Sequence, residues 1–268
     1  MENVLILIVS AFFVIFTLIL HTYLTWPSKD DDIPGLKGRS ILWLFAHPDD
    51  ECMFFGPSIL NLSQNNDVMV LCLSNGNESG LGRIRTKELE ASCNTLGIKE
   101  TYVNIENHAA LQDDPRIHWD PAIISDILKD YVTKNGIDTI ITFDDKGISG
   151  HPNHISCYNG ARVFAKNVSA NDVLIYKLKT VNVFRKYISL FDLTWTHYNY
   201  HVADMKKKTN GVVKPSTPPD TVLLVSSFEN YIKAREAMKC HKSQLVWFRY
   251  LYVLFSRYMV INELERVQ

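Results

Sequence analysis

Short, uninterrupted runs of apolar residues constrain the fold of this 268-residue chain more than any other feature. A strand buried on both faces of a sheet gives such a run, because neither face contacts water. The clearest runs cover residues 41–46, 67–73 and 137–143, and weaker ones cover 101–105, 173–176 and 222–225. Helical patterns alternate with the runs, and one of them begins at Asp120 and Pro121 and ends at Gly136. We therefore predict an α/β fold with a mostly parallel sheet and helices on both of its faces.

The N-terminus carries a longer apolar segment of another kind. Residues 4–20 contain no charged side chain, and Tyr23 and Trp26 follow where a span would reach the membrane interface. A cleaved signal peptide is the alternative, but it would have basic residues before the run and small residues at a cleavage site. Glu2 precedes the run here, and bulky residues follow it. We predict a transmembrane anchor over residues 4–26, a polar linker over 27–40 and a folded domain over 41–262.

Charge and cysteine usage indicate where this domain lies. Lys29, Lys37 and Arg39 follow the apolar segment and no basic residue precedes it, so the positive-inside rule places the domain in the cytosol. The five cysteines are scattered, without the spacing of a disulfide framework, which agrees with a reducing compartment. The formal net charge is −1, whereas a nucleic-acid-binding protein would show a strong basic excess. We expect no nucleic-acid partner, and the sequence predicts no particular oligomeric state.

Two polar clusters follow predicted strands. The sequence HPDDE at residues 47–51 comes directly after the first strand, and GHPNH at residues 150–154 comes soon after the strand that ends at Phe143. A solvated turn would explain a charged cluster, but such turns rarely follow an unbroken apolar strand at once. In an open α/β sheet, ligands bind outside the carboxyl ends of the strands. We therefore predict that the two clusters form one site.

The residue types in these clusters suit a catalytic metal. Zinc binds imidazole nitrogen and carboxylate oxygen, and a catalytic zinc uses three protein ligands. His47 and Asp50 are three residues apart, so one turn can direct both at an ion whose ligand set His154 completes. Asp49 then remains as a general base, and His151 remains to stabilise an oxyanion or to protonate a leaving amine. This set describes amide hydrolysis with zinc, or with iron or manganese as alternatives.

The same motifs resemble those of the PIG-L/LmbE-like zinc deacetylases, which carry AHPDDE and HPxH near the strand ends of a Rossmann-like fold. Here the motifs stand at residues 46–51 and 151–154, and the resemblance runs from about residue 41 to residue 259. It implies a Rossmann-like catalytic domain. It also implies that the metal ligands are His47, Asp50 and His154, the base is Asp49 and the oxyanion-stabilising group is His151.

Three further positions bear on the resemblance. Arg85 matches a family position that helps to hold the substrate, although an ordinary arginine on a helix surface is the alternative. The chain departs from bacterial thiol-biosynthetic members at Ser149, where they carry tyrosine, so no tyrosine role is carried over. It departs again at Asn153, where many bacterial members carry aspartate, so a charged partner for the site histidines is not expected there.

Within the family, the chain is most similar to the eukaryotic membrane-bound branch, in stretches such as residues 72–77 and 240–249. That likeness implies hydrolysis of the N-acetyl group of GlcNAc-phosphatidylinositol to GlcN-phosphatidylinositol and acetate. This reaction is the second step of GPI-anchor biosynthesis, and the implied location is the endoplasmic reticulum membrane with the domain on its cytosolic side. A deacetylase of another GlcNAc conjugate and an inactive membrane adaptor are the alternatives.

A second apolar segment lies near the C-terminus, at residues 243–259, and carries Arg249 and Arg257. The two arginines make it too charged for a comfortable transmembrane helix. We predict a core helix there, with a helix at the membrane surface as the alternative.

Overall fold

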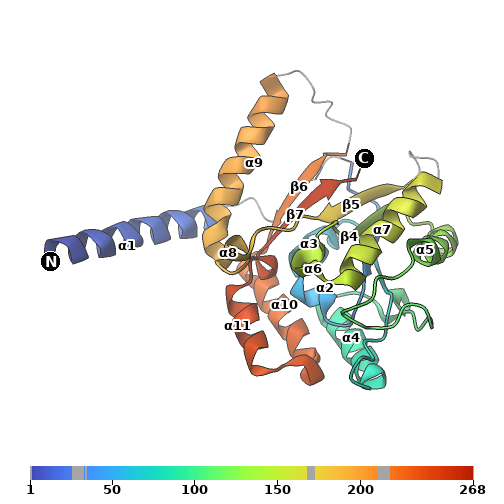
Figure 1. Ribbon diagram of the computed structural model, residues 1–268. Coiled ribbons are helices and arrows are strands. Elements are labelled where there is room, and N and C mark those ends of the chain that lie inside the picture. The colour runs from blue at the N-terminus through green and yellow to red at the C-terminus, as the bar shows by residue number, and fades with distance from the viewer. Residues whose placement is uncertain (1, 26–32, 34, 168–172, 210–217, 268) are drawn as a thin grey trace.

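The computed structural model describes residues 2–25, 33, 35–167, 173–209 and 218–267 (Figure 1). Its strands form one seven-stranded sheet in the order β3-β2-β1-β4-β5-β7-β6. The strands are β1 (Ser40–Phe45), β2 (Asp67–Cys72), β3 (Val103–Ile105), β4 (Thr139–Phe143), β5 (Leu174–Leu178), β6 (Thr221–Val225) and β7 (Ile261–Arg266). Strands β1 to β5 are parallel, and β7 is antiparallel to both of its neighbours. The sheet is therefore mixed but mostly parallel, which confirms the prediction.

β7 is a strand that the apolar runs do not predict. Its sequence INELER mixes apolar with polar or charged residues, and both glutamates pair with Lys179, which directly follows β5. The Nζ atom of Lys179 lies 2.6 Å from Oε1 of Glu263 and 3.0 Å from Oε1 of Glu265. An antiparallel strand with one buried face needs only alternate apolar residues, so no continuous run is present. β7 continues to Arg266, beyond residue 262, where the sequence predicts the end of the domain.

Helices cover both faces of the sheet, as predicted (Figure 1). α5 and α7 pack against each other, and α7 contacts β4 and β1. α3, α4 and α10 form a second group, in which α3 contacts β6 and β7. The bounds are α3 (Gly56–Leu62), α4 (Gly82–Leu96), α5 (Pro121–Asn135), α7 (Pro152–Asn167) and α10 (Phe228–Cys240).

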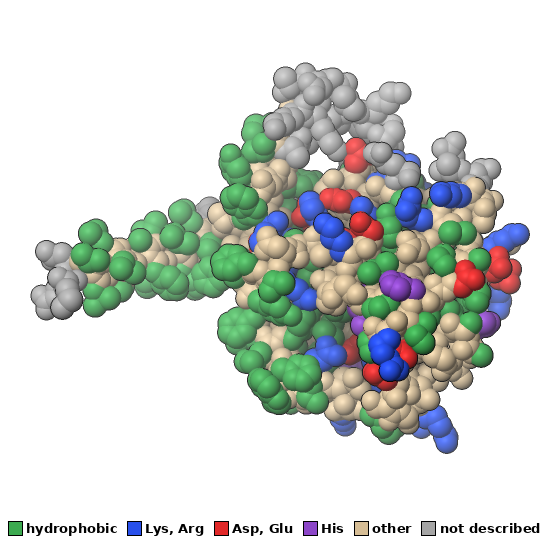
Figure 2. Space-filling view, in the orientation of Figure 1, with side chains coloured by type: hydrophobic (Ala, Val, Ile, Leu, Met, Phe, Trp, Pro, Cys, Tyr) green, Lys and Arg blue, Asp and Glu red, His purple; other side chains and the backbone are tan. Residues whose placement is uncertain are grey.

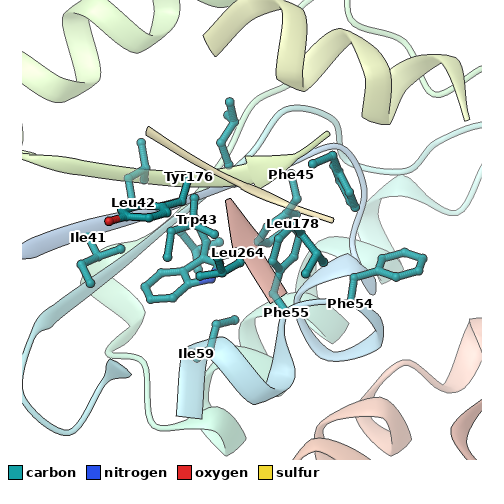
Figure 3. Close-up of a cluster of buried hydrophobic side chains, with 14 of the residues drawn as sticks. Ile41, Leu42, Trp43, Phe45, Phe54, Phe55, Ile59, Tyr176, Leu178 and Leu264 are labelled. Atoms are coloured by element: carbon teal, nitrogen blue, oxygen red, sulfur yellow. The ribbon is translucent and has the colours of Figure 1, made fainter. Parts of the chain in front are cut away.

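The buried cluster in Figure 3 holds β1 against its surroundings. Trp43 and Phe45 on β1 are fully buried, and the Phe45 ring lies 6.4 Å from the ring of Phe55. The indole nitrogen of Trp43 donates a hydrogen bond to Oγ of Ser58 at 3.2 Å, so its only polar group is satisfied. Close packing of this kind leaves β1 little freedom. The strand that leads into the HPDDE cluster is therefore a rigid support.

The N-terminal apolar segment forms the helix α1 (Glu2–Thr25). It packs against η2 (Ser189–Phe191) and α9 (Asp192–Thr209), and the rings of Phe12 and Phe191 are 6.5 Å apart. Among the residues that the structure describes, no helix has the length and apolarity needed to cross a membrane. The anchor and the division of the chain into anchor, linker and domain stay predictions. Residues 27–32 and 34 of the predicted linker lie outside the described residues.

The C-terminal apolar segment does not form one core helix. It forms α11 (Trp247–Phe255) and then η4 (Arg257–Met259). The side chains of Trp247 and Tyr250 are 75% and 61% exposed, whereas Tyr252 and all of η4 are buried. The prediction of a core helix is therefore wrong for α11, although it describes the environment of η4. Figure 2 shows the hydrophobic side chains over α11 on the same side of the molecule as α1.

Candidate metal centre and active site

The two polar clusters meet at the carboxyl ends of β1 and β4. These strands are parallel neighbours, with Leu42 opposite Ile140, so both ends lie at one edge of the sheet. The chain leaves β1 through His47 and enters α2 (Asp50–Met53). After β4 it passes through α6 (Gly147–Gly150), and α7 begins directly after His151. The structure thus brings together the side chains that the sequence predicts as one site.

Asp49 occupies a strained turn between β1 and α2. Its φ of 117° lies in the left-handed region, which costs a residue with a side chain roughly 1–3 kcal/mol. The backbone N–H of Asp49 donates to Oε2 of Glu51 at 3.0 Å. Glu51 is fully buried and is fixed in turn by Ser92 and by His241, whose Nε2 lies 2.7 Å from Oε1 of Glu51. This buried network holds the turn in the strained conformation, and of its members only Glu51 lies in the HPDDE motif.

Asp50 presents one carboxylate oxygen to each of the two histidines expected as ligands. Its Oδ2 accepts the backbone N–H groups of Ala46 and His47 at 3.1 and 2.9 Å. Its Oδ1 lies 3.3 Å from Nε2 of His154, and Oδ2 lies 3.7 Å from Nδ1 of His47. Two ligands on a tetrahedral zinc, each 2.0–2.1 Å from the ion, lie about 3.3 Å apart. The Asp50–His154 separation therefore fits two ligands of one small divalent ion, and the Asp50–His47 separation is 0.4 Å longer.

His47 and His154 each use one ring nitrogen to contact another part of the protein. Nδ1 of His154 lies 3.1 Å from the carbonyl oxygen of Gly147, so this nitrogen carries the proton and Nε2 keeps its lone pair. Nε2 of His47 lies 3.0 Å from Oδ1 of Asn153 and 3.1 Å from Oδ1 of Asp113, which leaves Nδ1 toward Asp50. Ligating histidines commonly donate their second N–H in this way. The donor set therefore fits a metal in its chemistry as well as in its spacing.

Gly147 permits this arrangement by its lack of a side chain. Its φ is +55°, and a Cβ atom there would lie 2.9 Å from Cβ of His154. Asp144 shapes the turn, because its Oδ1 accepts the backbone N–H groups of Lys146 and Gly147. Oδ2 of Asp144 also accepts the backbone N–H of Thr180, which ties the turn to the chain after β5. The turn thus places the Gly147 carbonyl where it can fix the ring of His154.

Asp113 is the partner of His47 that the sequence did not reveal. The position where bacterial members carry aspartate is Asn153 here, and Asn153 contacts His47 through a neutral amide oxygen. The carboxylate comes instead from Asp113, in the loop between β3 and α5. This loop has no motif and no regular spacing from His47. The loop follows the carboxyl end of β3, which pairs with β2, and this position alone indicates that it could reach the site.

Burial and neighbouring charges separate the pKa values of the acidic pair. Burial raises the pKa of Asp49, and the guanidinium groups of Arg249 and Arg85 offset only part of this. Burial would also raise the pKa of Asp50, but the imidazoles of His154 and His47 hold it well below its usual value. Asp50 is therefore an anion suited to bind a cation, and Asp49 is a stronger base than an exposed aspartate.

His151 is half-buried, and its imidazole lies beside those of His47 and His154. Its ring centroid is 4.8 Å from that of His47 and 4.8 Å from that of His154, and nitrogens of the three rings all lie within 4.8 Å of one another. Burial and the two neighbouring imidazoles lower its pKa to about 4, so it is neutral at pH 7. Its Nδ1 accepts the backbone N–H of Asn153 at 3.3 Å. The proton therefore sits on Nε2, which can donate a hydrogen bond.

Two arginines form ion pairs with Asp49, one at each of its carboxylate oxygens. Arg85 is buried on α4, where its guanidinium donates to the carbonyl oxygens of Pro48 and Gly76 at 2.6 and 3.1 Å. It is therefore not the exposed helix residue of the alternative interpretation, and its contacts position the HPDDE turn. Its predicted contact with substrate stays a prediction. Arg249 comes from α11, and its Nη2 lies 3.1 Å from Oδ2 of Asp49. The sequence placed Arg249 in an apolar segment and gave no sign of this contact.

A cavity of about 590 Å³ adjoins the site on the α11 side. Arg249 joins the cavity to Asp49, and Phe54 joins it to His154, whose ring centroid lies 5.6 Å from that of Phe54. The remaining lining residues are Met53, Ser149, Lys186, Tyr187, Phe248, Leu251, Tyr252 and Phe255. A cavity of this size can hold a ligand much larger than an acetamido group.

Comparison with known proteins gives matches over most of the chain. A family model described as PIG-L, GlcNAc-PI de-N-acetylase, matches residues 42–165. A probable N-acetylglucosaminyl-phosphatidylinositol de-N-acetylase of Schizosaccharomyces pombe is 42% identical, over 86% of this chain and 88% of the relative. The N-acetylglucosaminyl-phosphatidylinositol de-N-acetylase of Bos taurus is 39% identical, over 87% and 85%. The solved structure of N,N'-diacetylchitobiose deacetylase from Pyrococcus horikoshii shares the fold, with a TM-score of 0.55 and 17% identity over 89% of this chain and 87% of that chain.

Proposed function

Because the chain belongs to the PIG-L family of GlcNAc-PI de-N-acetylases, we propose that it hydrolyses the N-acetyl group of GlcNAc-phosphatidylinositol. The products are GlcN-phosphatidylinositol and acetate, and the reaction is the second step of GPI-anchor biosynthesis. The observation that carries this proposal is the Asp50–His154 pair, with oxygen and nitrogen 3.3 Å apart beside His47 and with the basic Asp49 next to them. We propose zinc as the metal, because two imidazoles and one carboxylate suit it.

The roles of the site residues follow from their contacts. A divalent metal held by His47, Asp50 and His154 would supply a Lewis acid that polarises the acetyl carbonyl and lowers the pKa of water. Asp49 accepts a proton from the attacking water, since burial makes its carboxylate a better base. Nε2–H of His151 donates a hydrogen bond to the oxygen that gains negative charge. The carbon–nitrogen bond then breaks as the amine takes the proton that Asp49 accepted, and acetate leaves.

We propose a location at the endoplasmic reticulum membrane, and the apolar surface on the α11 side supports contact with a bilayer. Exposed apolar side chains gather on α1, on α11 and on the segment from α8 (Val183–Lys186) to the start of α9. Phe184 and Trp247 are each 75% exposed, and Trp195 is 58% exposed. Figure 2 shows these hydrophobic regions on one side of the molecule, beside the hollow where charged side chains and histidines meet. An apolar surface of this kind, with basic residues among it, suits contact with a bilayer.

This location would bring the enzyme to a substrate that stays in the membrane. The N-terminal apolar segment would keep the enzyme there, and the basic residues Lys29, Lys37 and Arg39 favour a cytosolic domain. Appending an N-glycosylation acceptor to the C-terminus and testing for glycosylation in microsomes measures the orientation. Glycosylation of that acceptor would place the domain in the lumen and contradict this part of the proposal.

The test of the function is acetate release by the purified chain. GlcNAc-phosphatidylinositol is compared with a soluble GlcNAc conjugate that lacks inositol, each with wild type and with the Asp49→Asn variant. We expect the inositol lipid to be the better substrate and Asp49→Asn to abolish most of the rate. Faster hydrolysis of the soluble conjugate would identify a deacetylase of another GlcNAc conjugate. No acetate from either substrate with metal-replete protein would support an inactive adaptor.

A further inference from the structure

Lys186 is a buried cation without an anionic partner among the described residues. Its side chain lies at the end of α8, is 7% exposed and lines the cavity of about 590 Å³ beside the active site. Its ammonium group lies 5.4 Å from the centre of the Tyr187 ring, and no carboxylate of the described residues forms an ion pair with it. Burial lowers the pKa of the Lys186 ammonium group. An unpaired buried charge costs free energy, so a chain that keeps one usually has a ligand for it.

Arg249 brings a second cation to the same cavity. Its Nη2 is bound to Asp49, and its Nη1 faces Sδ of Met53, which is a weak acceptor. Its Nε is buried and has no hydrogen-bond partner among the described residues. Ser149 adds a hydroxyl group to the lining. The cavity therefore offers two cations and one hydroxyl with unfilled donor capacity, and its other lining residues are mostly apolar or aromatic.

The kinds of side chain that line the cavity match one kind of molecule. The inner end reaches the predicted base through Arg249, and Lys186 lines the same cavity. Phe248, Leu251 and Phe255 line the cavity and are about half exposed, at 51%, 48% and 47%, so they continue it to the apolar surface of α11. A ligand that fits has an amide toward Asp49, an anionic group for the two cations and apolar chains toward α11. A glycosylated phosphoinositide carries all three kinds of group.

We infer that Lys186 and Arg249 form the binding subsite for the substrate's phosphodiester, with the acyl chains passing over α11 toward the bilayer. This inference rests on the proposed function. Lys186 is the specific element, because Arg249 is shared with Asp49. α8 is held in place through Arg185, the residue before Lys186. Arg185 and Arg257 both bind the buried carboxylate of Asp192, at 2.6 and 2.8 Å. The subsite is therefore built on a fixed support rather than on a free surface lysine.

The test compares two substrates that differ in the phosphate. Full-length protein in detergent is assayed for acetate release from GlcNAc-phosphatidylinositol and from GlcNAc-inositol, which has no phosphate. Lys186→Met is expected to lower kcat/KM for the lipid about 10- to 100-fold more than for GlcNAc-inositol, mainly through KM, because one charge-assisted contact is lost. Lys186→Arg keeps the charge and is expected to recover most of the preference. Lys233→Met, at an exposed lysine on α10, is the matched control and keeps the wild-type ratio.

Stability separates this role from a structural one. Lys186→Met removes an unpaired buried charge and keeps an apolar stem, so its melting temperature is expected to equal or exceed that of wild type. A lower melting temperature, with equal losses on both substrates, would assign Lys186 a structural role and overturn the inference. Wild-type protein that prefers a GlcNAc conjugate without phosphoinositol would instead overturn the proposed function itself.

A competition experiment distinguishes a lipid headgroup from a free anion. Glycerophosphoinositol is expected to inhibit wild type more strongly than either myo-inositol or inorganic phosphate, and to lose this advantage in Lys186→Met. Equal inhibition by inorganic phosphate and glycerophosphoinositol would show a site for free phosphate and would contradict the phosphodiester assignment.

Discussion

Replacing Asp113 by asparagine keeps the shape of the side chain and removes its charge. Oδ1 of Asp113 lies 3.1 Å from Nε2 of His47, and Oδ2 lies 3.1 Å from Nη1 of Arg85. The amide oxygen of asparagine can still accept one of these hydrogen bonds. The change therefore isolates the effect of a carboxylate on the histidine that the site would use to bind metal.

The expected effect is a loss of zinc affinity. Partners behind ligating histidines typically contribute 10- to 100-fold to metal affinity, which is about 1.4–2.8 kcal/mol. Asp113 is well suited to this role because its side chain is only 7% exposed, so water screens its charge little. Burial would raise its own pKa, but the hydrogen bond and charge of His47 lower it, so it remains ionised at neutral pH.

The loss depends on pH in a defined direction. Burial lowers the pKa of His47, but the hydrogen bond that His47 donates to Asp113 and the charge of Asp50 outweigh it, so the net pKa is raised. Metal binds only the neutral imidazole, so protons compete with zinc as the pH falls. Asp113 thus raises the affinity of His47 for zinc, and it also raises the affinity of His47 for the protons that compete with zinc. The advantage of wild type over Asp113→Asn is expected to be largest at mildly alkaline pH and to shrink in mild acid.

The assay is zinc titration against a chromogenic chelator at mildly acidic, neutral and mildly alkaline pH. Asp114→Asn is the matched control, because it makes the same change one residue away. Asp114 is paired with Arg116 at 2.8 Å in the same loop and does not contact His47 in the structure. Wild-type zinc affinity in Asp113→Asn at every pH, or an equal loss in Asp114→Asn, would refute the role of Asp113.

Three further expectations follow from buried charges. Asp49→Asn should lower kcat for acetate release by about 10²- to 10⁴-fold with zinc stoichiometry retained, and wild-type kcat would remove Asp49 as the base. Asp192→Ala leaves Arg257 buried without its carboxylate and should cost about 3–5 kcal/mol in urea unfolding, whereas unchanged stability would show that water reaches Arg257. Burial opposes the charges of the Glu51–His241 pair, but their mutual attraction lowers the pKa of Glu51 and raises that of His241. The stabilisation from this pair is lost as pH falls through the folded pKa of Glu51 and as pH rises through that of His241. It is therefore complete between the ordinary pKa values of the two groups, 4.5 and 6.5. The stability difference between wild type and His241→Gln should peak in this window, and a difference independent of pH would contradict the pairing.

The parallel part of the fold could be predicted because buried parallel strands leave a strong signal. The runs at residues 41–46 and 67–73 became β1 and β2 with bounds shifted by no more than one residue. β7 left no such signal, because its glutamates are neutralised by lysine across the sheet rather than by any feature of its own sequence. The segment of α11 misled for the opposite reason. Its apolar residues indicate burial, but a sequence cannot say whether protein or membrane covers them.

The site shows the same division between local and distant contacts. The motifs at residues 47–51 and 151–154 were brought together as predicted, because each follows a strand end and the strands are neighbours. Asp113, Arg249 and Lys186 could not be found, since they reach the site from a loop, from α11 and from α8. No spacing rule links side chains about two hundred residues apart. Only packing reveals that Arg249 contacts Asp49.

The most direct test of the catalytic metal centre is acetate release from GlcNAc-phosphatidylinositol, measured together with bound zinc on one purified preparation. Wild type should contain one zinc per chain, lose activity when a chelator removes it and regain activity when zinc is restored. His154→Ala should bind zinc weakly and remain inactive after zinc is added. Full activity of the chelated, metal-free protein, or wild-type activity of His154→Ala, would contradict the metal centre formed by His47, Asp50 and His154.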